Sequence, residues 1–122
     1  MRTMLVNFSN HPSRYWVKRQ MEAAAAIYGE IVDLPFPVVA PDADSQELLI
    51  MAQDCVQKIL SMGDVNKVTV HIMGEMTFTF MVVTKLKEMG IRCVAYTTER
   101  KVTYTSDGVK QAEFQFVNFR EY

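Results

Sequence analysis

Three short segments of the sequence, residues 9–14, 74–77 and 97–100, hold most of the polar side chains that an alternation of strands and helices does not explain. A proline-rich segment at 35–37 is the fourth candidate loop. Hydroxyl, amide and guanidinium groups bind phosphate, and histidine is the side chain best suited to proton transfer near neutral pH. These segments therefore predict a site for an anionic ligand, with His11 as its candidate acid or base.

Individual residues in these segments have both a functional and a structural explanation. Asn10, Ser13 and Thr77 are suited to receive a phosphate, together with the unpaired backbone amides at the start of a helix. Arg14 and Arg100 can supply the opposite charge. Ser13 and Thr77 are also residue types that cap helices, and capping alone accounts for each of them.

Caps do not explain why so many polar and charged side chains gather at one predicted edge of the fold. The residues concerned are His11, Arg14, Glu75, Glu99 and Arg100. Glu75 and Glu99 fit two descriptions, a catalytic pair of carboxylates or solvated partners of arginine, and sequence spacing does not separate the two. The crowding itself favours a binding site at this edge.

The sequence lacks the motifs of several common nucleotide-binding and hydrolytic sites. It has no Gly-x-Gly-x-x-Gly, no Gly-x-x-x-x-Gly-Lys-Ser/Thr and no Gly-x-Ser-x-Gly. Their absence argues against a dinucleotide cofactor, P-loop hydrolysis and a hydrolase triad. His11 and His71 lack the spacing of metal ligands, and Cys55 and Cys93 lie far apart. We expect no cofactor and no metal, with both cysteines and His71 in the core.

Apolar periodicity predicts alternating strands and helices along the chain. Strands are expected at 3–8, 30–34, 68–73 and 91–96, helices at 13–28, 45–62 and 78–89, and a β-hairpin around Ser106-Asp107-Gly108. This order predicts an α/β fold: a Rossmann-like three-layer α/β/α domain with a four-stranded parallel sheet and a C-terminal antiparallel β-hairpin at one edge. Residues 1–122 are expected to form one domain.

The predicted topology brings the four segments together. In a parallel α/β sheet the loops beyond the carboxyl ends of the strands meet at one edge, where helix N-termini point their unpaired N–H groups. Each of the four segments follows one of the four predicted parallel strands. We therefore expect them to form a single pocket.

Composition restricts the class of protein. The chain has 122 residues, with 13 Lys and Arg against 14 Asp and Glu. This length suits one domain that needs no disulfide or structural metal. A net charge of -1 gives no reason to bind duplex DNA or an anionic membrane. The N-terminus lacks the features of a signal peptide and no stretch approaches the ~20 apolar residues of a membrane span, so a cytoplasmic location is expected.

Five segments resemble a family of small prokaryotic proteins associated with CRISPR, single-domain relatives of the CRISPR-associated Rossmann fold. They are NFSNHPS at 7–13, DLPFP at 33–37, GEMTF at 74–78, TTER at 97–100 and FVNFREY at 116–122. The resemblance covers nearly the whole chain. It implies a role in antiviral defence, as a type III CRISPR accessory protein that binds a cyclic oligoadenylate and either sequesters it or cleaves it as a metal-independent ring nuclease.

The resemblance also implies a homodimer and a set of site residues. In this fold the cyclic ligand lies across a twofold axis, held by the loops after the first and the third or fourth strands. The implied catalytic residues are His11, Ser13 and Arg100, and the implied ligand-binding residues are Asn10, Arg14, Gly74, Glu75, Thr77, Thr97 and Thr98. In this scheme His11 moves a proton while Ser13 and Arg100 stabilise charge at the phosphate.

Two other classes of protein are compatible with the sequence. One is a protein-interaction scaffold from a CRISPR locus that binds no ligand, and the other is a binder or hydrolase of an ordinary mononucleotide. Whether the protein is an enzyme stays open at this point. The aromatic C-terminal strand, with Phe114, Phe116 and Phe119, has one face and one edge to cover, which is typical of a dimer interface.

Overall fold

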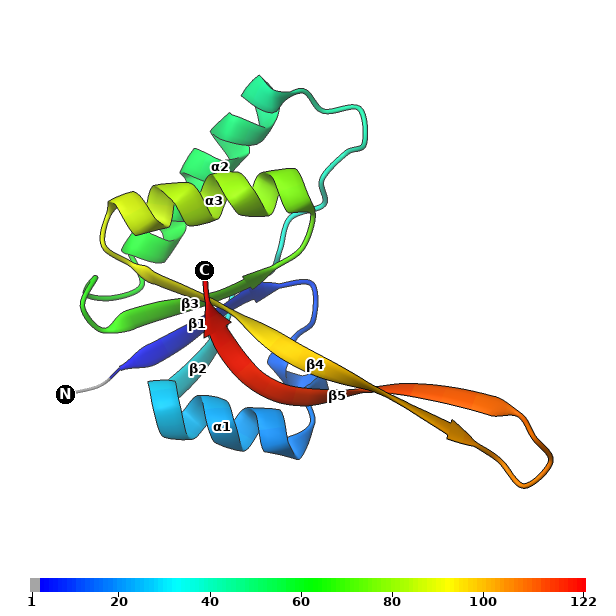
Figure 1. Cartoon of the computed structure of the whole chain (residues 1–122). Coiled ribbons are helices and arrows are strands. Elements are labelled where there is room, and N and C mark those ends of the chain that lie inside the picture. Colours follow the sequence, from blue (N-terminus) through cyan, green and yellow to red (C-terminus); the bar gives the residue numbers. More distant parts are fainter. Residues whose placement is uncertain (1–2) are drawn as a thin grey trace.

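The structure is a computed structural model that describes residues 3–122, in which three α-helices pack on a five-stranded sheet. The strand order is β2-β1-β3-β4-β5; the first four strands run parallel, and β5 runs antiparallel to β4. The helix α1 covers one face of the sheet, and α2 and α3 cover the other (Figure 1). The elements are β1 (Met4–Ser9), a 3-10 turn (Ser13–Tyr15), α1 (Lys18–Tyr28), β2 (Glu30–Asp33), α2 (Ser45–Leu60), β3 (Val68–Met73), α3 (Met76–Glu88), β4 (Arg92–Tyr104) and β5 (Lys110–Glu121).

The two faces of the sheet bury different kinds of side chains. Successive residues of a strand point to opposite faces, so Val6 and Phe8 enter the apolar core beneath α2 and α3, while Leu5 and Asn7 lie on the α1 face. Buried polar residues gather on that second face: Asn7, Ser9, Thr69, His71 and, on α1, Gln20. Because buried polar groups need hydrogen-bond partners, the α1 face must hold a polar network.

The α/β class and several local predictions are confirmed. Asp44 caps α2, since its carboxylate accepts a hydrogen bond from the Glu47 N–H at 2.8 Å. The predicted hairpin turn is present, with the Gly108 N–H donating to the Thr105 carbonyl at 2.9 Å. Gly108 has a φ of 84°, a backbone conformation that glycine adopts without strain.

The predicted number of strands is wrong, because the fourth parallel strand does not end at Tyr96. It continues as the first strand of the hairpin, so β4 is a single strand of 13 residues and the sheet has five strands in all. The polar segment 97–100 contains no glycine or proline, and each of its residues pairs with β5. A shift in register between Thr97 and Thr98 bends the ribbon there. An extended polar segment can stay in a strand when a partner strand satisfies its backbone.

The first predicted helix also begins later than expected. Residues Ser13–Tyr15 form one 3-10 turn, and the regular helix starts at Lys18. Between them Trp16 and Val17 have extended backbone angles, and the buried Trp16 side chain reaches back to the carbonyl of His11 at 3.0 Å. The extended backbone at Trp16 and Val17 interrupts the helix.

The two cysteines are core residues, as predicted. Cys55 and Cys93 are both buried and unpaired. Burial raises the pKa of the Cys93 thiol to about 12, so the thiol is protonated and unreactive at neutral pH.

Candidate functional site

The connections change direction between β1 and β3, which places the candidate site at the carboxyl ends of these strands. β1 has β2 on one side and β3 on the other, so the chain leaves the two central strands toward opposite sides, and ligands of open α/β sheets bind at such a position. Ser9 and Met73, the last residues of β1 and β3, lie opposite each other. The segments 10–16 and 74–77 begin there, and we call them the rim.

Asn7 is the centre of a hydrogen-bond network beneath the rim. Its Nδ2 donates to Oδ1 of Asp33 at 2.8 Å and to the carbonyl of His11 at 3.0 Å. Its Oδ1 accepts from the Ser9 hydroxyl at 2.8 Å and lies 2.9 Å from Nδ1 of His71. Every donor and acceptor position of this buried amide is therefore in use. The network joins β1, β2 and β3 to the rim.

The backbone of His11 is held on several sides. Its carbonyl accepts hydrogen bonds from Asn7 and from Nε1 of Trp16, both at 3.0 Å, and its N–H donates to the Ser9 hydroxyl at 3.2 Å. Its imidazole is only partly buried, with its centroid 6.3 Å from that of the Tyr96 ring. The network therefore fixes the position of His11 and leaves its ring able to meet a ligand.

His71 is a buried, hydrogen-bonded core histidine, as the sequence predicted. Because Oδ1 of Asn7 can only accept, Nδ1 of His71 carries the proton. Trp16 packs edge-on at 5.3 Å, and Tyr96 stacks at 5.5 Å. Burial, with a smaller contribution from the charge of nearby His11, lowers the pKa of His71 to about 4. Its Nε2 is buried and has no hydrogen-bond partner within residues 3–122.

The carboxylate of Asp33 accepts hydrogen bonds from both donors of Ser13. Oδ1 of the carboxylate accepts from the Ser13 N–H at 3.1 Å, and Oδ2 accepts from the Ser13 hydroxyl at 2.7 Å. Partial burial acts to raise the pKa of Asp33, but hydrogen bonds from Asn7 and Ser13 outweigh it and hold the pKa below its usual value. An ionised carboxylate thus lies where the sequence suggested a phosphate.

Glu75 fills the corresponding position at the start of α3. Its carboxylate accepts from the Thr77 hydroxyl and from the Phe78 N–H, the latter at 2.8 Å. These hydrogen bonds lower the pKa of Glu75. The helix cap is therefore Glu75, and the expectation that Thr77 caps this helix is wrong. A negative side chain stabilises the positive end of α3, and it competes there with any anionic ligand.

Gly74 has a packing role at the base of the rim. A Cβ atom at this position would lie 2.3 Å from Cζ of Phe36. That ring cannot move aside easily, because it packs against two other rings: its centroid lies 5.1 Å from that of Phe8 and 5.4 Å from that of Phe78. The segment 35–37 thus reaches the base of the rim through Phe36, which packs against Gly74, Phe8 and Phe78.

Thr97, Thr98 and Arg100 lie in a strand instead of a loop. Pairing of β4 with β3 extends only to Val94, and beyond it the pairing is with β5 alone. The Thr97 hydroxyl donates to the carbonyl of Asn118 at 3.2 Å. In Figure 1 the ribbon of β4 and β5 leaves the body of the domain. The structure therefore does not bring Thr98 and Arg100 to the rim.

Asn10 and Arg14 are the remaining predicted residues, and both are exposed on the rim. The guanidinium carbon of Arg14 lies 4.7 Å from the centre of the Tyr15 ring, in a cation–π contact. With His11, which is half-buried, they are predicted residues on the rim that are accessible to solvent.

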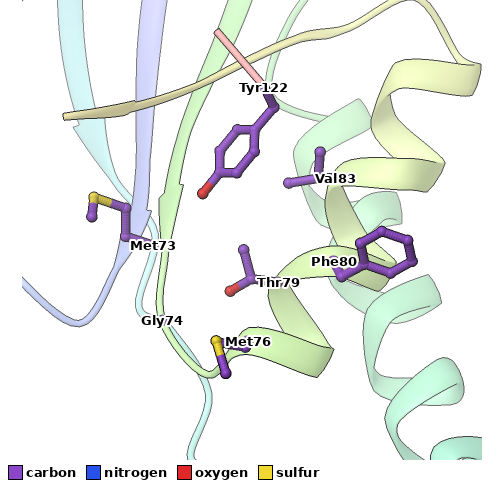
Figure 2. Close-up of a pocket in the computed structure, with 7 residues that line it drawn as sticks. All are labelled: Met73, Gly74, Met76, Thr79, Phe80, Val83 and Tyr122. Atoms are coloured by element: carbon purple, nitrogen blue, oxygen red, sulfur yellow. The ribbon is translucent and has the colours of Figure 1, made fainter. Parts of the chain in front are cut away.

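A pocket of about 330 Å³ lies on the other side of β3, between this strand and α3 (Figure 2). Its lining residues are Met73, Gly74, Met76, Thr79, Phe80, Val83 and Tyr122. Tyr122 forms one wall and donates to the carbonyl of Ile72 at 2.6 Å. The Thr79 hydroxyl is buried without a partner in the described part of the chain. Because none of the lining side chains carries a charge, this pocket suits an apolar group and not a phosphate.

Within residues 3–122, no three His, Cys, Asp or Glu side chains gather closely enough to hold a metal ion. No helix of that region has the length and apolar character needed to cross a bilayer.

The residues that organise the site were not among its predicted members. Asn7, Asp33 and Tyr96 lie within or at the ends of strands, where the sequence pattern indicates packing. A signal was nevertheless present, because an asparagine inside the apolar run Leu5-Val6-Asn7-Phe8 must be buried with partners.

Fold and rim together define an α/β domain whose candidate site lies at the carboxyl ends of its parallel strands. The chain matches the model of the uncharacterized protein MJ1673 family over residues 3–120, and it belongs to that family. No curated protein and no solved structure gives a significant match.

Proposed function

We propose that this Rossmann-like domain binds a cyclic oligoadenylate at its rim, as a homodimer, and opens the ring by metal-independent phosphodiester cleavage in type III CRISPR defence. The ligand class, the dimer and the cellular role come from the family resemblance of the sequence. The observation that carries the proposal is the fixed position of His11, whose backbone is hydrogen-bonded to Asn7, Ser9 and Trp16. A network of this kind fixes the backbone of one residue at the sheet edge where ligands bind in open α/β sheets.

The proposed reaction needs little from the protein besides placement and proton transfer. A ribose 2′-oxygen attacks the adjacent phosphorus, the bond from phosphorus to the 5′-oxygen breaks, and a linear product with a 2′,3′-cyclic phosphate results. The 2′-hydroxyl proton passes to the imidazole of His11, and the leaving 5′-oxygen takes a proton from that imidazolium or from water. In-line geometry supplies much of the acceleration.

Charge at the rim indicates which side chains would meet the phosphates. Asp33 and Glu75 already accept the hydrogen bonds of Ser13 and of the first turn of α3. The exposed guanidinium of Arg14 and amide of Asn10 are therefore the groups that we assign to the phosphates. Ser13 acts in this proposal by holding Asp33, and not as a catalytic residue.

A second candidate function, a protein-interaction scaffold without a ligand, is favoured by one observation. On the surface of α3, Met76 is 82% exposed and Phe80 is 72% exposed. Adjacent large apolar side chains on a helix surface are typical of a contact with another protein.

The test uses the full chain with cyclic tri-, tetra- and hexa-adenylate, and with AMP and ATP as mononucleotide controls. We expect a rise in Tm with at least one ring, and chromatography should show a linear product that forms in the presence of EDTA. A Tm shift with AMP or ATP alone would support the mononucleotide alternative. No shift with any nucleotide would overturn the proposal and favour the scaffold.

A further inference from the structure

The two faces of the β4–β5 ribbon beyond the body of the domain carry different kinds of side chains. We call residues 98–104 and 110–116, with the turn between them, the arm (Figure 1). Directly paired residues of antiparallel strands share a face, and alternate residues change face. From the observed register, one face holds Thr98, Arg100, Val102, Tyr104, Lys110, Ala112, Phe114 and Phe116, and the other holds Glu99, Lys101, Thr103, Gln111, Glu113 and Gln115. We call the first the aromatic–basic face and the second the polar face.

The aromatic–basic face is largely uncovered. Tyr104 and Phe114 are each 69% exposed and Val102 is 41% exposed, while the strands of the arm pair with no third strand of the described sheet. An isolated two-stranded ribbon is marginally stable in water, and it gains stability when its apolar face is covered. A contact that covers this face would therefore stabilise the arm.

This face continues the core of the domain. Phe116 is only 6% exposed and packs at 5.2 Å from Phe119, which belongs to the cluster beneath α1. Val17 and Arg19, at the start of α1, share a hollow of about 180 Å³ with residues 113–116. The arm and the start of α1 thus form a corner in which Phe114 is the exposed aromatic residue, with Glu113 at its edge.

The two faces of the arm differ in charge: the aromatic–basic face carries cations alone, whereas the polar face carries two carboxylates and the cation Lys101. Arg100 and Lys110 lie on the aromatic–basic face, whereas the carboxylates of Glu99 and Glu113 belong to the polar face. The carboxylate of Asp107, in the turn, already accepts a hydrogen bond from the Thr105 hydroxyl. A surface of aromatic rings and cations, with the carboxylate of Glu113 only at its edge, matches a partner that combines flat apolar rings with negative charge.

We infer that the aromatic–basic face of the arm binds single-stranded oligonucleotide, with bases stacked on Phe114 and Tyr104 and phosphates near Arg100 and Lys110. Stacking on aromatic side chains beside cations is how proteins hold single strands without reading their sequence. A second copy of the chain fits less well, since two such faces packed together would gather Arg100 and Lys110 of both copies in one apolar contact, with only the edge carboxylates of Glu113 to oppose them. This site lies apart from the rim and does not depend on the proposed function.

The test measures fluorescence anisotropy of 5′-labelled 12-nucleotide oligoadenylate and oligouridylate RNA with the full chain at low and physiological salt. Two matched pairs of variants separate the faces. Arg100→Glu and Lys101→Glu make the same change of charge at adjacent residues on opposite faces. Phe114→Ala and Phe80→Ala remove equally exposed phenylalanines from the arm and from α3. Tm and circular dichroism establish that every variant is folded.

We expect the wild-type chain to bind both RNAs, more weakly as salt rises. Arg100→Glu and Phe114→Ala should each raise Kd by about tenfold or more, and both control variants should leave it within about twofold. No binding by the wild-type chain, or equal losses in both members of a pair, would overturn the inference. So would sedimentation showing that Phe114→Ala only dissociates a dimer. Ring binding is measured separately, so its failure leaves this result unaffected.

Discussion

Nδ2 of Asn7 lies 2.8 Å from Oδ1 of Asp33, and this hydrogen bond joins the middle of β1 to the end of β2 directly beneath the rim. The same carboxylate holds both the N–H and the hydroxyl of Ser13. Through one buried amide and one carboxylate, the sheet thus sets the path of the loop that carries His11.

Replacing Asn7 tests this arrangement directly. Asn7→Ala removes one hydrogen bond each from Asp33 and from the His11 carbonyl, and it removes the partner of Nδ1 of His71. Buried groups that lose their partners are costly, so we expect the free energy of unfolding to fall by about 3 kcal/mol. Urea denaturation measures it. Asn10→Ala, on the exposed rim, is the control and should change stability by less than about 0.5 kcal/mol; similar losses in the two variants would contradict the network.

The depressed pKa of His71 predicts a pH-dependent stability. The histidine titrates near 6.5 in the unfolded chain and at about 4 in the folded one. As pH falls from 7 toward 4, the unfolded chain takes up a proton that the folded chain does not, so the contribution present above pH 6.5 is progressively lost. We expect a loss of about 3 kcal/mol by pH 4. In His71→Gln the difference between urea midpoints at pH 7 and pH 4.5 should shrink; an unchanged difference would assign the effect to other groups.

Gly74 should not tolerate a larger residue. In Gly74→Ala the new Cβ meets the Phe36 ring at 2.3 Å, and we expect a loss of about 2 kcal/mol from overpacking. Phe36→Leu removes the far end of that ring. The double variant should therefore be more stable than the sum of the two single losses predicts, as a double-mutant cycle of unfolding free energies would show. Strict additivity would mean that the two positions do not touch.

The proposed ring opening predicts different effects for two rim residues. His11→Ala removes the proton acceptor, so single-turnover cleavage should slow by about a hundredfold while the Kd for the ring stays nearly constant. Arg14→Ala removes a charge that contacts phosphate, so Kd should rise by about tenfold. Ser13→Ala is the comparison variant, because in this proposal Ser13 acts only through its hydrogen bonds to Asp33 and does not contact the ring. Loss of binding in His11→Ala with cleavage of bound ring unchanged would reverse the assigned roles.

Much of the fold follows from local sequence patterns. The cap at Asp44, the turn at Ser106-Asp107-Gly108 and strand 68–73 all depend on residues close together in the chain. The continuous strand β4 was missed because segment 97–100 is polar and resembles a loop. It stays extended because it pairs with β5, and local sequence patterns do not reveal such pairing between segments separated in the chain.

The sequence by itself determined the order of the elements, the loop that carries His11 and the burial of His71, because apolar periodicity and turn chemistry act over a few residues. The tertiary structure decided which partners meet. Asn7 and His71 are 64 residues apart, and only the parallel register of β1 and β3 brings them together. The tertiary structure also places Asp33 and Glu75 where phosphates were expected, and it places Arg100 on the arm. The reason is that hydrogen-bond partners and strand pairing form only when the whole chain packs.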